Sequence, residues 1–471
     1  MFSIALQTLG CKLNQLESES IAGAFMREGF TLVPWERGGA DIFLVNTCTV
    51  TSKAEQKARR IIRKILKESP EACVIVTGCY AQVEADAVAA LTDGKGGTPL
   101  YRKRLFVISG DRKSSLLDLP KFLADSEKTA GNPALILEKW TQNPDSSSPQ
   151  DRFCFNPQDF SNHSRAFLKI QDGCDSRCSY CRVTLARGPS VSLGADRVLS
   201  RLRALEAAGF GEAVLTGVNI CQYRDGSLGL SGLLEYLLGE TGYIALRVSS
   251  VEPEYISRDL VKALGNPRIR PHFHLAIQSG SPGVLKKMGR AYSPESIEAG
   301  VSLLRSVKGD PFFACDMITG FPGETGGEFE ETYEFCRRMD FSWIHAFPYS
   351  PRPGTAAYHF KGRVCERESV SRVKALLDLA QQGRRNYIRR WIGKKVDAVI
   401  EGKTPYGGGD KKNVPYVTAL SDNYLRLLFP AGGTDPLPPG RVVPCRIRAL
   451  DESGPALPGI SRFDALGERL W

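Results

Sequence analysis

Long apolar runs and a disulfide framework are both missing from this sequence of 471 residues. No stretch approaches the roughly 18 to 20 consecutive apolar residues needed to cross a bilayer. The 13 cysteines are an odd number in a long chain, unlike the dense, even sets of small secreted domains. The start, MFSIALQTLGCKLNQ, carries no basic segment before its short apolar stretch. We therefore expect a cytoplasmic protein with no membrane partner, whose thiols serve metal chemistry.

An excess of acidic charge is also lacking. The chain has 62 Lys and Arg against 52 Asp and Glu, and its formal net charge of +10 favours a polyanionic partner. Between Lys361 and Lys395, eleven Lys and Arg stand against three acidic residues, which gives this stretch a formal charge of +8. Apolar residues at roughly helical spacing within 366–391 predict one or two helices there. A solvated basic helix is the alternative to a phosphate-binding one.

The first 140 residues predict an α/β domain, because short apolar strands alternate with Cys-containing turns and helical patterns. The strands SIAL, DIFLVN and CVIVTG run within a few residues into Cys11, Cys48 and Cys79. If the strands are parallel, their carboxyl ends meet at one edge of the sheet, where open α/β sheets place ligands. We therefore expect these three thiols to converge. After Cys48, Ser52 and Glu55 predict a capping box at the start of a helix.

The remaining sequence predicts a linker and two further domains. Residues 141–163 include a stretch rich in Pro, Ser, Asn and Asp, which is typical of a linker. Six strand-like runs alternate with helical stretches over 164–392, and this predicts a partial (β/α)6 barrel of parallel strands closed by the basic helices. The six runs are AFLKI, EAVLTGV, ALRVSS, FHLAIQ, FACDMITG and WIHAFPY. Strand-like pieces separated by Gly and Pro turns predict a small β-barrel over 393–471.

The sharpest motif is CDSRCSYC, which contains Cys174, Cys178 and Cys181. Thiolates bind iron–sulfur clusters, and a 4Fe-4S cube needs one ligand per iron, so three ligands leave one iron open. An open iron can chelate the amino and carboxylate groups of S-adenosylmethionine (SAM), whose one-electron cleavage yields a 5′-deoxyadenosyl radical. A structural zinc site is the alternative, but zinc normally takes four Cys or His ligands, and no fourth ligand follows at finger spacing.

Several motifs resemble the methylthiotransferase family of radical SAM enzymes across nearly the whole chain. These motifs are TLGCKLNQLES, VNTCTVTSKAEQKAR, VTGCYAQ, CDSRCSYC, LTGVNI, SSVEP, HFHLAIQSGS, KKMGRAY, DMITGFPGET and FPYSPRPGTAA. The resemblance implies an N-terminal methylthiotransferase domain over 1–140, a radical SAM barrel, and a TRAM-like RNA-binding β domain over 393–471. One departure is Thr184, which stands where the family frequently has a proline.

The resemblance also implies cofactors and their ligands. A radical SAM 4Fe-4S cluster is expected on the CDSRCSYC cysteines, and an auxiliary 4Fe-4S cluster on Cys11, Cys48 and Cys79. Tyr180 is expected near the adenine of SAM, with three further residues in the cofactor pocket of the barrel. These three are Gln278, Ser279 and Gly320.

Other residues are weaker candidates. Arg290, Tyr292 and Arg352 are candidates for contact with cofactor or RNA, although single Arg and Tyr residues more often pack or face solvent. Cys221 is expected to pack in the core, and contact with the cluster, sulfur or substrate is the alternative.

The family's mechanism implies two uses of SAM, one as methyl donor to sulfur and one as the source of the radical. The target carbon, C2 of adenine, offers no acidic proton, so we assign no side-chain acid or base. The radical step needs an electron donor, expected to be flavodoxin-like or ferredoxin-like, and the residues identify no sulfur donor.

The first motif, GCKLNQLES, resembles the branch that acts on N6-threonylcarbamoyladenosine beside the tRNA anticodon. Two alternatives keep the chemistry and change the target, to N6-isopentenyladenosine of tRNA or to an aspartate of a ribosomal protein. A third is a non-catalytic, metal-containing RNA-binding protein.

Overall fold

The computed structural model describes residues 2–91, 104–142, 151–156, 164–406, 414–430, 438–450 and 464–470. The chain forms two compact units, and each is assembled from separate stretches of sequence. Unit 1 comprises Met1–Asp159, Asp172–Val191 and Ser350–Tyr358. Unit 2 comprises Phe160–Gln171, Ser192–Tyr349 and His359–Trp471. In the described parts, no helix is long and apolar enough to span a membrane.

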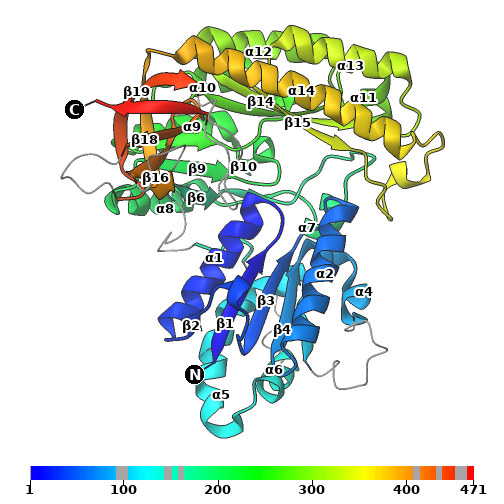
Figure 1. Cartoon of the computed structure of the whole chain (residues 1–471), viewed down its shortest axis with the longest axis vertical. Helices are drawn as coiled ribbons and strands as arrows, with labels where there is room; N and C mark the ends of the chain where they lie inside the picture. The colour runs from blue at the N-terminus through cyan, green and yellow to red at the C-terminus, as the bar shows by residue number, and fades with distance from the viewer. Residues whose placement is uncertain are drawn as a thin grey trace. The chain divides into compact units, whose positions relative to one another are not determined.

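A parallel sheet forms the centre of unit 1, in the order β2-β1-β3-β4-β5. Its strands are β1 (Ser3–Thr8), β2 (Thr31–Leu32), β3 (Ile42–Thr47), β4 (Cys73–Gly78) and β5 (Leu105–Val107). Every residue of β3 and β4 is buried, as is typical of central parallel strands covered on both faces. The three strands predicted from the sequence are therefore confirmed, and they lie side by side (Figure 1).

Alternation along the strands divides the core of unit 1 into two layers. Val45 and Val76 pack on one face of the sheet with Ile62, whereas Leu44 and Ile75 belong to the core cluster on the other face. The α-helices of the unit are α1 (Lys12–Arg27), α2 (Ser52–Glu68), α3 (Cys79–Val83), α4 (Ala85–Ala89), α5 (Leu119–Ala130), α6 (Pro133–Thr141) and α7 (Val183–Arg187).

The start of α2 differs from the predicted capping box. Thr51, and not Ser52, is the N-cap, and its side chain accepts a hydrogen bond from the Ala54 N–H at 3.1 Å. Glu55 is buried and accepts a hydrogen bond from the Thr49 hydroxyl at 2.5 Å. Thr51 and Ser52 are adjacent, and both are residue types that cap helices. The spacing of a capping box from Glu55 therefore indicated Ser52, one residue after the N-cap in the structure.

Six parallel strands form the centre of unit 2, as the sequence predicted. They are β6 (Ala166–Lys169), β9 (Glu212–Thr216), β12 (Ala245–Val248), β13 (His272–Gln278), β14 (Phe312–Thr319) and β15 (Trp343–Pro348). They pair as β12-β9-β6 and β13-β14-β15, and two parallel bridges, Leu246 to Ile269 and Val251 to Leu275, connect the two groups.

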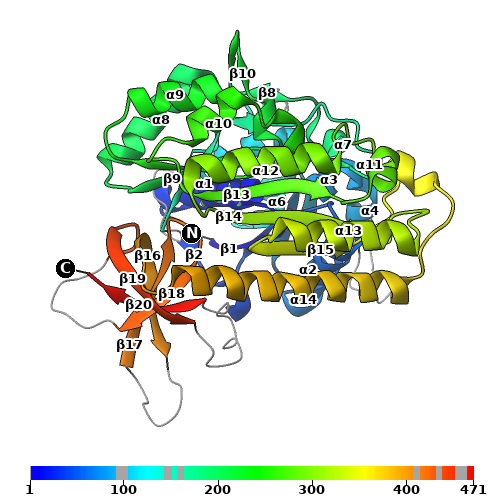
Figure 2. The ribbon, with the colours of Figure 1, turned by 90° about the horizontal axis from the view of Figure 1, so that it is seen from above.

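Helices connect the strands of unit 2 and run along the sheet (Figure 2). They are α8 (Ala195–Ala207), α9 (Leu230–Gly239), α10 (Arg258–Leu264), α11 (Pro282–Met288), α12 (Pro294–Lys308), α13 (Gly326–Met339) and α14 (Glu366–Trp391). The basic segment is thus one helix. Three of its arginines pair within the fold: Arg372 with Glu324, Arg384 with Asp464, and Arg390 with Asp310 and Asp340.

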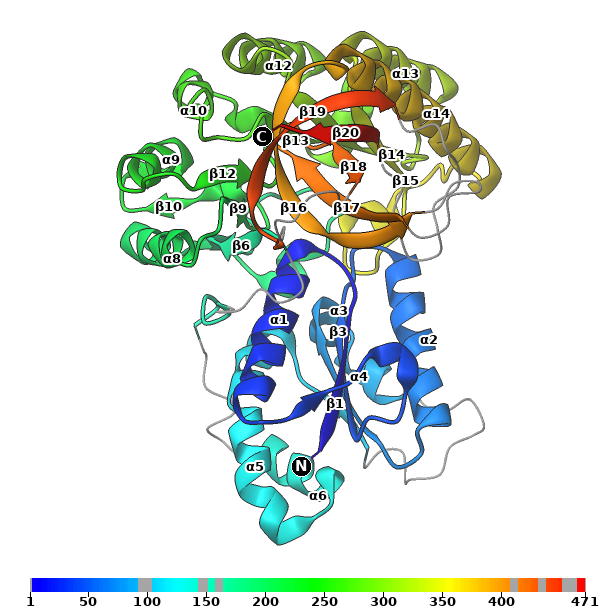
Figure 3. The ribbon, with the colours of Figure 1, turned by 60° about the vertical axis from the view of Figure 1, so that its left-hand side comes forward.

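The C-terminal strands close into a barrel in the order β16-β17-β18-β20-β19 (Figure 3). They are β16 (Lys395–Tyr406), β17 (Val414–Ser421), β18 (Arg426–Pro430), β19 (Val442–Leu450) and β20 (Ala465–Arg469). The predicted small barrel is confirmed, and β20 is a strand that was not expected from the sequence. Phe312 of β14 and Tyr387 of α14 belong to the same core as the barrel residues Leu427 and Phe429, so the two parts of unit 2 are packed together.

The expected domain boundary falls largely on undescribed chain. Within the predicted linker, residues 143–150 and 157–163 lie outside the described residues. Residues 172–191 and 350–358 belong by packing to unit 1, although they lie inside the stretch that the sequence assigned to the barrel.

Candidate functional site

Three cysteines of unit 1, here called the sheet triad, follow three adjacent strands. Cys11 is the N-cap of α1 after β1, Cys48 directly follows β3, and Cys79 is the first residue of α3 after β4. Because β1, β3 and β4 pair in parallel, all three cysteines lie at the same edge of the sheet. The expected convergence at this edge therefore has a direct structural basis.

Two glycines let the flanking turns approach the end of β3 and Cys48 closely. Gly10 precedes Cys11 with φ +109°, and a Cβ at Gly10 would lie 2.7 Å from the Cys48 Cβ and 3.0 Å from its sulfur. Gly78 precedes Cys79 with φ +98°, and a Cβ there would lie 2.4 Å from the Thr47 carbonyl oxygen. Only glycine tolerates both the backbone conformation and the contact. The Gly-Cys pair that recurs at 10–11 and 78–79 is the sequence signal for these close approaches.

A buried asparagine holds two of these turns together. The Asn14 amide donates hydrogen bonds to the carbonyl oxygens of Leu9 at 2.8 Å and Thr47 at 3.1 Å. The Asn46 amide donates in turn to the Asn14 carbonyl oxygen at 3.0 Å. Both asparagines are buried, so their hydrogen bonds fix the turns that carry Cys11 and Cys48.

Arg187 supplies positive charge beside the sheet triad. Burial is the main cause that raises the pKa of Cys48 to about 11, and the Cys79 and Cys11 thiols raise it further, whereas the Val50 N–H and the Arg187 guanidinium oppose the rise. Arg187 donates hydrogen bonds to Asn14 at 2.9 Å and Glu17 at 3.0 Å, and to a third partner, Asp172, at 3.1 Å. This arginine therefore connects the segment 172–191 to the turns around the sheet triad.

The other three cysteines, here called the loop triad, border a cavity of about 470 Å³. Cys174, Cys178 and Cys181 line it together with residues of 184–189 and 354–356. The Cys174 N–H donates to the Gly188 carbonyl oxygen at 3.1 Å, and the Ala357 N–H donates to the Ser179 carbonyl oxygen at 2.8 Å. Helix α7 begins at Val183, so the chain is helical at Thr184 without the proline that is frequent in the family.

The donors around both triads suit thiolate ligands. Backbone N–H groups of Ser176, Val183 and Val50 point at the sulfurs of Cys174, Cys181 and Cys48, at 3.4, 3.4 and 3.5 Å. Such N–H donors stabilise thiolate sulfur in iron–sulfur sites. Among the described residues, no three His, Cys, Asp or Glu side chains are arranged to hold a single metal ion. A 4Fe-4S cube instead takes each thiolate on a different iron, so its ligands surround the cube.

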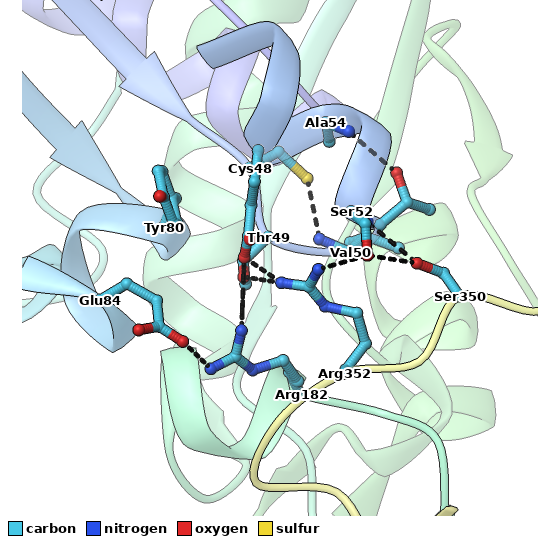
Figure 4. Close-up of polar contacts among 12 residues, drawn as sticks. Cys48, Thr49, Val50, Ser52, Ala54, Tyr80, Glu84, Arg182, Ser350 and Arg352 are labelled. Atoms are coloured by element: carbon cyan, nitrogen blue, oxygen red, sulfur yellow. Dashed lines mark hydrogen bonds and ion pairs between the residues drawn. The ribbon is translucent and has the colours of Figure 1, made fainter. Parts of the chain in front are cut away.

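A buried charge cluster ties three segments of unit 1 together (Figure 4). Glu55 of α2 pairs with Arg182 at 3.3 Å and with Arg352 in a close ion pair. Arg182, the residue after Cys181, also pairs with Glu84 at 2.6 Å. Both arginines approach the hydroxyl of Thr49, the residue after Cys48, at 3.5 and 3.1 Å. One carboxylate therefore links the chain beside Cys48 to the chain beside Cys181.

The strap 350–358 is anchored to the start of α2. The Ser52 N–H donates to the Ser350 hydroxyl at 2.9 Å, and Arg352 donates to the Ser52 hydroxyl at 3.0 Å. Arg352 was a candidate for contact with cofactor or RNA, but its side chain is 3% exposed and binds protein groups. The roles of Glu55 and Arg182 in this cluster were not expected from the sequence.

The four expected SAM-pocket residues fall in both units. Tyr180 is half-buried in the loop triad segment of unit 1. In unit 2, Gln278 ends β13 at a register shift with φ +73°, a strained conformation of the kind found at functional sites. Ser279 is fully buried, and its hydroxyl lies 3.1 Å from that of Thr332. A Cβ at Gly320, with φ +70°, would lie 2.3 Å from the Ser369 hydroxyl of α14.

Two further candidates are held by protein partners. Arg290 pairs with Glu252 at 2.7 Å, and the Tyr292 hydroxyl donates to the carbonyl oxygen of Ile277 at 2.8 Å. Cys221 is buried, and its sulfur accepts a hydrogen bond from the Glu252 N–H at 3.4 Å. Burial raises the pKa of Cys221 to about 12, so it is a protonated, packed thiol at neutral pH.

Comparisons with known proteins match both units. Residues 3–95 match the "Uncharacterized protein family UPF0004", and residues 168–336 match the "Radical SAM superfamily". The "Threonylcarbamoyladenosine tRNA methylthiotransferase MtaB" of Treponema pallidum (strain Nichols) is 40% identical over 466 residues, covering 91% of this chain and 94% of its own. The protein of the same name in Aquifex aeolicus (strain VF5) is 33% identical, with 84% and 92% covered. The "tRNA-2-methylthio-N(6)-dimethylallyladenosine synthase" of Koribacter versatilis (strain Ellin345) is 30% identical, with 84% and 86% covered.

Proposed function

We propose that this chain, which belongs to the family of threonylcarbamoyladenosine tRNA methylthiotransferases called MtaB, adds a methylthio group to C2 of N6-threonylcarbamoyladenosine beside the tRNA anticodon. The observation that carries the proposal is the 40% identity with the treponemal relative over 91% of this chain. The relative named as a dimethylallyladenosine synthase reaches 30%. The identity therefore favours the threonylcarbamoylated base as target.

We assign the loop triad to the 4Fe-4S cluster that binds SAM, and the sheet triad to a second 4Fe-4S cluster. The first assignment is supported by the cavity beside Cys174, Cys178 and Cys181 and by the match to the radical SAM superfamily. The second is supported by the shared sheet edge and the two close-approach glycines. When bound, these groups supply one-electron cleavage of SAM and a site for the transferred sulfur.

The chain's own residues are placed to position these groups. Arg187 places a positive charge beside the sheet triad, and thiolate ligands favour a nearby cation. Glu55, through Arg182 and Thr49, couples the residues that follow Cys181 and Cys48. We keep Tyr180, Gln278, Ser279 and Gly320 as proposed SAM contacts and assign no side-chain acid or base. The electron donor is proposed to be flavodoxin-like or ferredoxin-like.

We propose that tRNA phosphates contact an exposed basic stripe on α14. Arg367, Lys374, Arg385 and Arg389 are exposed, and their spacings of 7, 11 and 4 residues place them along one side of a helix. The affinity for tRNA should fall as salt rises. Exchanging Arg385 and Arg389 for Glu should make the plot of log affinity against log salt less steep by up to about 2, because each lost phosphate contact removes roughly one unit of steepness. Exchanging Arg258 and Lys262 of α10 for Glu is the matched control and should leave the slope unchanged.

The test of the reaction is anaerobic incubation of the reconstituted protein with SAM, dithionite and threonylcarbamoylated tRNA. Mass spectrometry should detect both 5′-deoxyadenosine and the methylthio nucleoside. Modification of isopentenylated tRNA or of a ribosomal protein, with the threonylcarbamoylated base untouched, would reassign the target. Neither product from a protein with full iron content would contradict the whole assignment.

A further inference from the structure

Three polar side chains of unit 2 form a hydrogen-bonded chain across three neighbouring strand segments. The Ser250 hydroxyl, just after β12, lies 2.9 Å from Nδ1 of His274 in β13. Nε2 of the same ring lies 3.1 Å from Asp316 in β14. The side chains of His274 and Asp316 are 17% and 30% exposed, so solvent reaches both. The reaction assigned above uses none of these groups.

The polar chain lies on the face of the strands opposite the connecting helices. Cys315 precedes Asp316, is fully buried, and interacts with Cys336 of α13. Side chains alternate along a strand, so Asp316 points away from α13. Arg305 of α12 lies over the Phe313 ring at 5.4 Å, which places α12 on the same side as α13.

One end of this face is closed by the C-terminal barrel. Tyr424 stacks on His272 with ring centroids 3.8 Å apart, and Arg247 lies over the Tyr424 ring at 5.2 Å. In β13, His274 lies two residues after the packed His272. In β14, Asp316 lies four residues after the packed Phe312. They therefore form the next layer along these strands, beyond the packed His272, Phe312 and Arg247.

His345 of β15 extends the layer. Its ring lies 5.5 Å from the His274 ring, and it stacks with Phe347 at 6.5 Å. The Trp343 indole N–H donates to Nδ1 of His345 at 3.2 Å, so the neutral ring carries its proton on Nε2. The layer thus combines a ring N–H donor, an aromatic surface and the carboxylate of Asp316, which accepts hydrogen bonds.

We propose that Ser250, His274, Asp316 and His345 recognise the polar group on N6 of the target adenosine, an inference that rests on the proposed function. A threonylcarbamoyl group carries urea N–H groups, a hydroxyl and a carboxylate, whereas an isopentenyl group has no hydrogen-bonding atoms. A layer built to form hydrogen bonds rejects an apolar group strongly, because covering its polar atoms with that group removes the water they contact and offers no new partner.

The distances also indicate which atoms would contact the group on N6. With a neutral His274, the Nε2–H donates to Asp316 and Nδ1 accepts from the Ser250 hydroxyl. Asp316 is thereby held in place with acceptor capacity for a urea N–H or a hydroxyl. The Nε2–H of His345 is the donor suited to the substrate carboxylate. The order Ser250, His274, Asp316 is also that of a hydrolase triad, so the test includes hydrolysis as an outcome.

The test compares two synthetic anticodon stem-loops that differ only in the N6-threonylcarbamoyl group, bound to the cluster-loaded protein. The unaltered protein should prefer the modified stem-loop. His274→Phe and Asp316→Asn should each lower affinity for that stem-loop by about 10- to 100-fold, the range expected for a lost charged hydrogen bond. The loss should be confined to the modified stem-loop. Asp259→Asn removes the same charge from an exposed position of α10 and should change neither affinity.

The outcomes separate the inference from the proposed function. If the variants lose equal affinity for both stem-loops, or lose none, this layer does not recognise the threonylcarbamoyl group. The proposed function still stands in that case, provided that the unaltered protein forms the methylthio nucleoside. Release of the threonylcarbamoyl group, abolished by Ser250→Ala, would replace recognition with hydrolysis. If the unaltered protein neither prefers nor modifies the threonylcarbamoylated stem-loop, both proposals fail together. Unchanged melting temperature and iron content exclude misfolding of the variants.

Discussion

At the scale of single residues, unit 1 depends on carboxylates that are almost closed to water. Glu55 is 7% exposed and Glu17 is 2% exposed. Arginines from distant segments neutralise both, and Lys113 also pairs with Glu17 at 2.6 Å. Desolvating such charges is costly, so each carboxylate stabilises the fold only while its partners remain in place.

Glu55→Gln should lower the free energy of unfolding by about 3 to 5 kcal/mol, because it leaves Arg182 and Arg352 without their shared carboxylate. Urea denaturation at neutral pH measures the loss. Glu68→Gln, on the same helix, removes a carboxylate that is 61% exposed and pairs with Lys64 at 3.8 Å. That control should cost about 0.5 kcal/mol or less. Equal costs for the two variants would show that the buried cluster contributes no special stability.

Gly10→Ala should remove the cluster proposed at the sheet triad, because its Cβ would collide with Cys48. The measurement is iron per protein in a background in which Cys174, Cys178 and Cys181 are replaced by Ala, so that only the sheet triad can hold a cluster. Gly209→Ala is the control, since Gly209 also has positive φ, at +86°, but has open space around it. Full iron content in the Gly10→Ala variant would show that the turn can shift without disrupting the site.

Residue types and spacing single out the six cysteines, whose role as cluster ligands stays a prediction, but they do not reveal the side chains that surround them. Cysteines at strand ends and in CDSRCSYC stand out because few other residue types bind clusters. Arg187 and Glu55 look like surface charges in the sequence, since their partners are 170 and 297 residues away. Asn14 and Gly10 act through backbone contacts to a neighbouring strand, and spacing along one chain does not encode such contacts.

At the scale of elements, the short apolar runs predicted the central strands well, because parallel strands buried on both faces are continuously apolar. Short edge pieces were missed. Strand β20 follows undescribed chain and pairs with both β18 and β19, and its sequence ALGER has no strong alternation. The helix start at Thr51 was misplaced because two capping residues are adjacent.

Glu212 is the first residue of β9, and its charge predicts that the free energy of unfolding depends on pH. Burial raises the pKa of Glu212, but Arg247, Arg270 and Arg165 together lower it from 4.5 to about 2. The carboxylate therefore stabilises the fold fully above pH 4.5, and this contribution is lost as the pH falls through 2. The shift corresponds to roughly 3 kcal/mol.

Glu212→Gln should therefore be less stable than the unaltered protein at neutral pH, and the gap should shrink as the pH falls below 4.5. Denaturation of cluster-free protein across this range measures the gap. Glu235→Gln provides the comparison, because Glu235 is 54% exposed and pairs with Lys262 at 3.6 Å. A gap that stays constant down to pH 2 would contradict a depressed pKa for Glu212.

At the scale of the whole molecule, the chain does not build its units in sequence order. Unit 1 contains the first 159 residues and two later insertions, 172–191 and 350–358. Those insertions supply the loop triad and the arginines that neutralise Glu17 and Glu55. A cut at the predicted linker therefore separates buried acids from their partners.

A fragment of residues 1–159 should unfold at a much lower urea concentration than unit 1 in the full chain. The sharper expectation concerns Glu55→Gln, which should be neutral or stabilising in the fragment although it destabilises the full chain. In the fragment the carboxylate has lost both buried arginines, so removing its charge relieves a desolvation cost. The same cost of the substitution in both contexts would show that residues 182 and 352 do not stabilise Glu55.

The strap at 350–358 also sets a timetable for biosynthesis. Arg352 lies 297 residues after its partner Glu55, and at typical translation rates of about 5 to 20 residues per second it is made roughly 15 to 60 seconds later. Arg182 is made earlier, 127 residues after Glu55, so until Arg352 follows, the nascent N-terminal sheet carries a carboxylate with only one of its two buried arginines. The charge cluster beside Cys48 and Cys181 is thus complete only after Arg352 has left the ribosome, and loading of the proposed clusters belongs after that point.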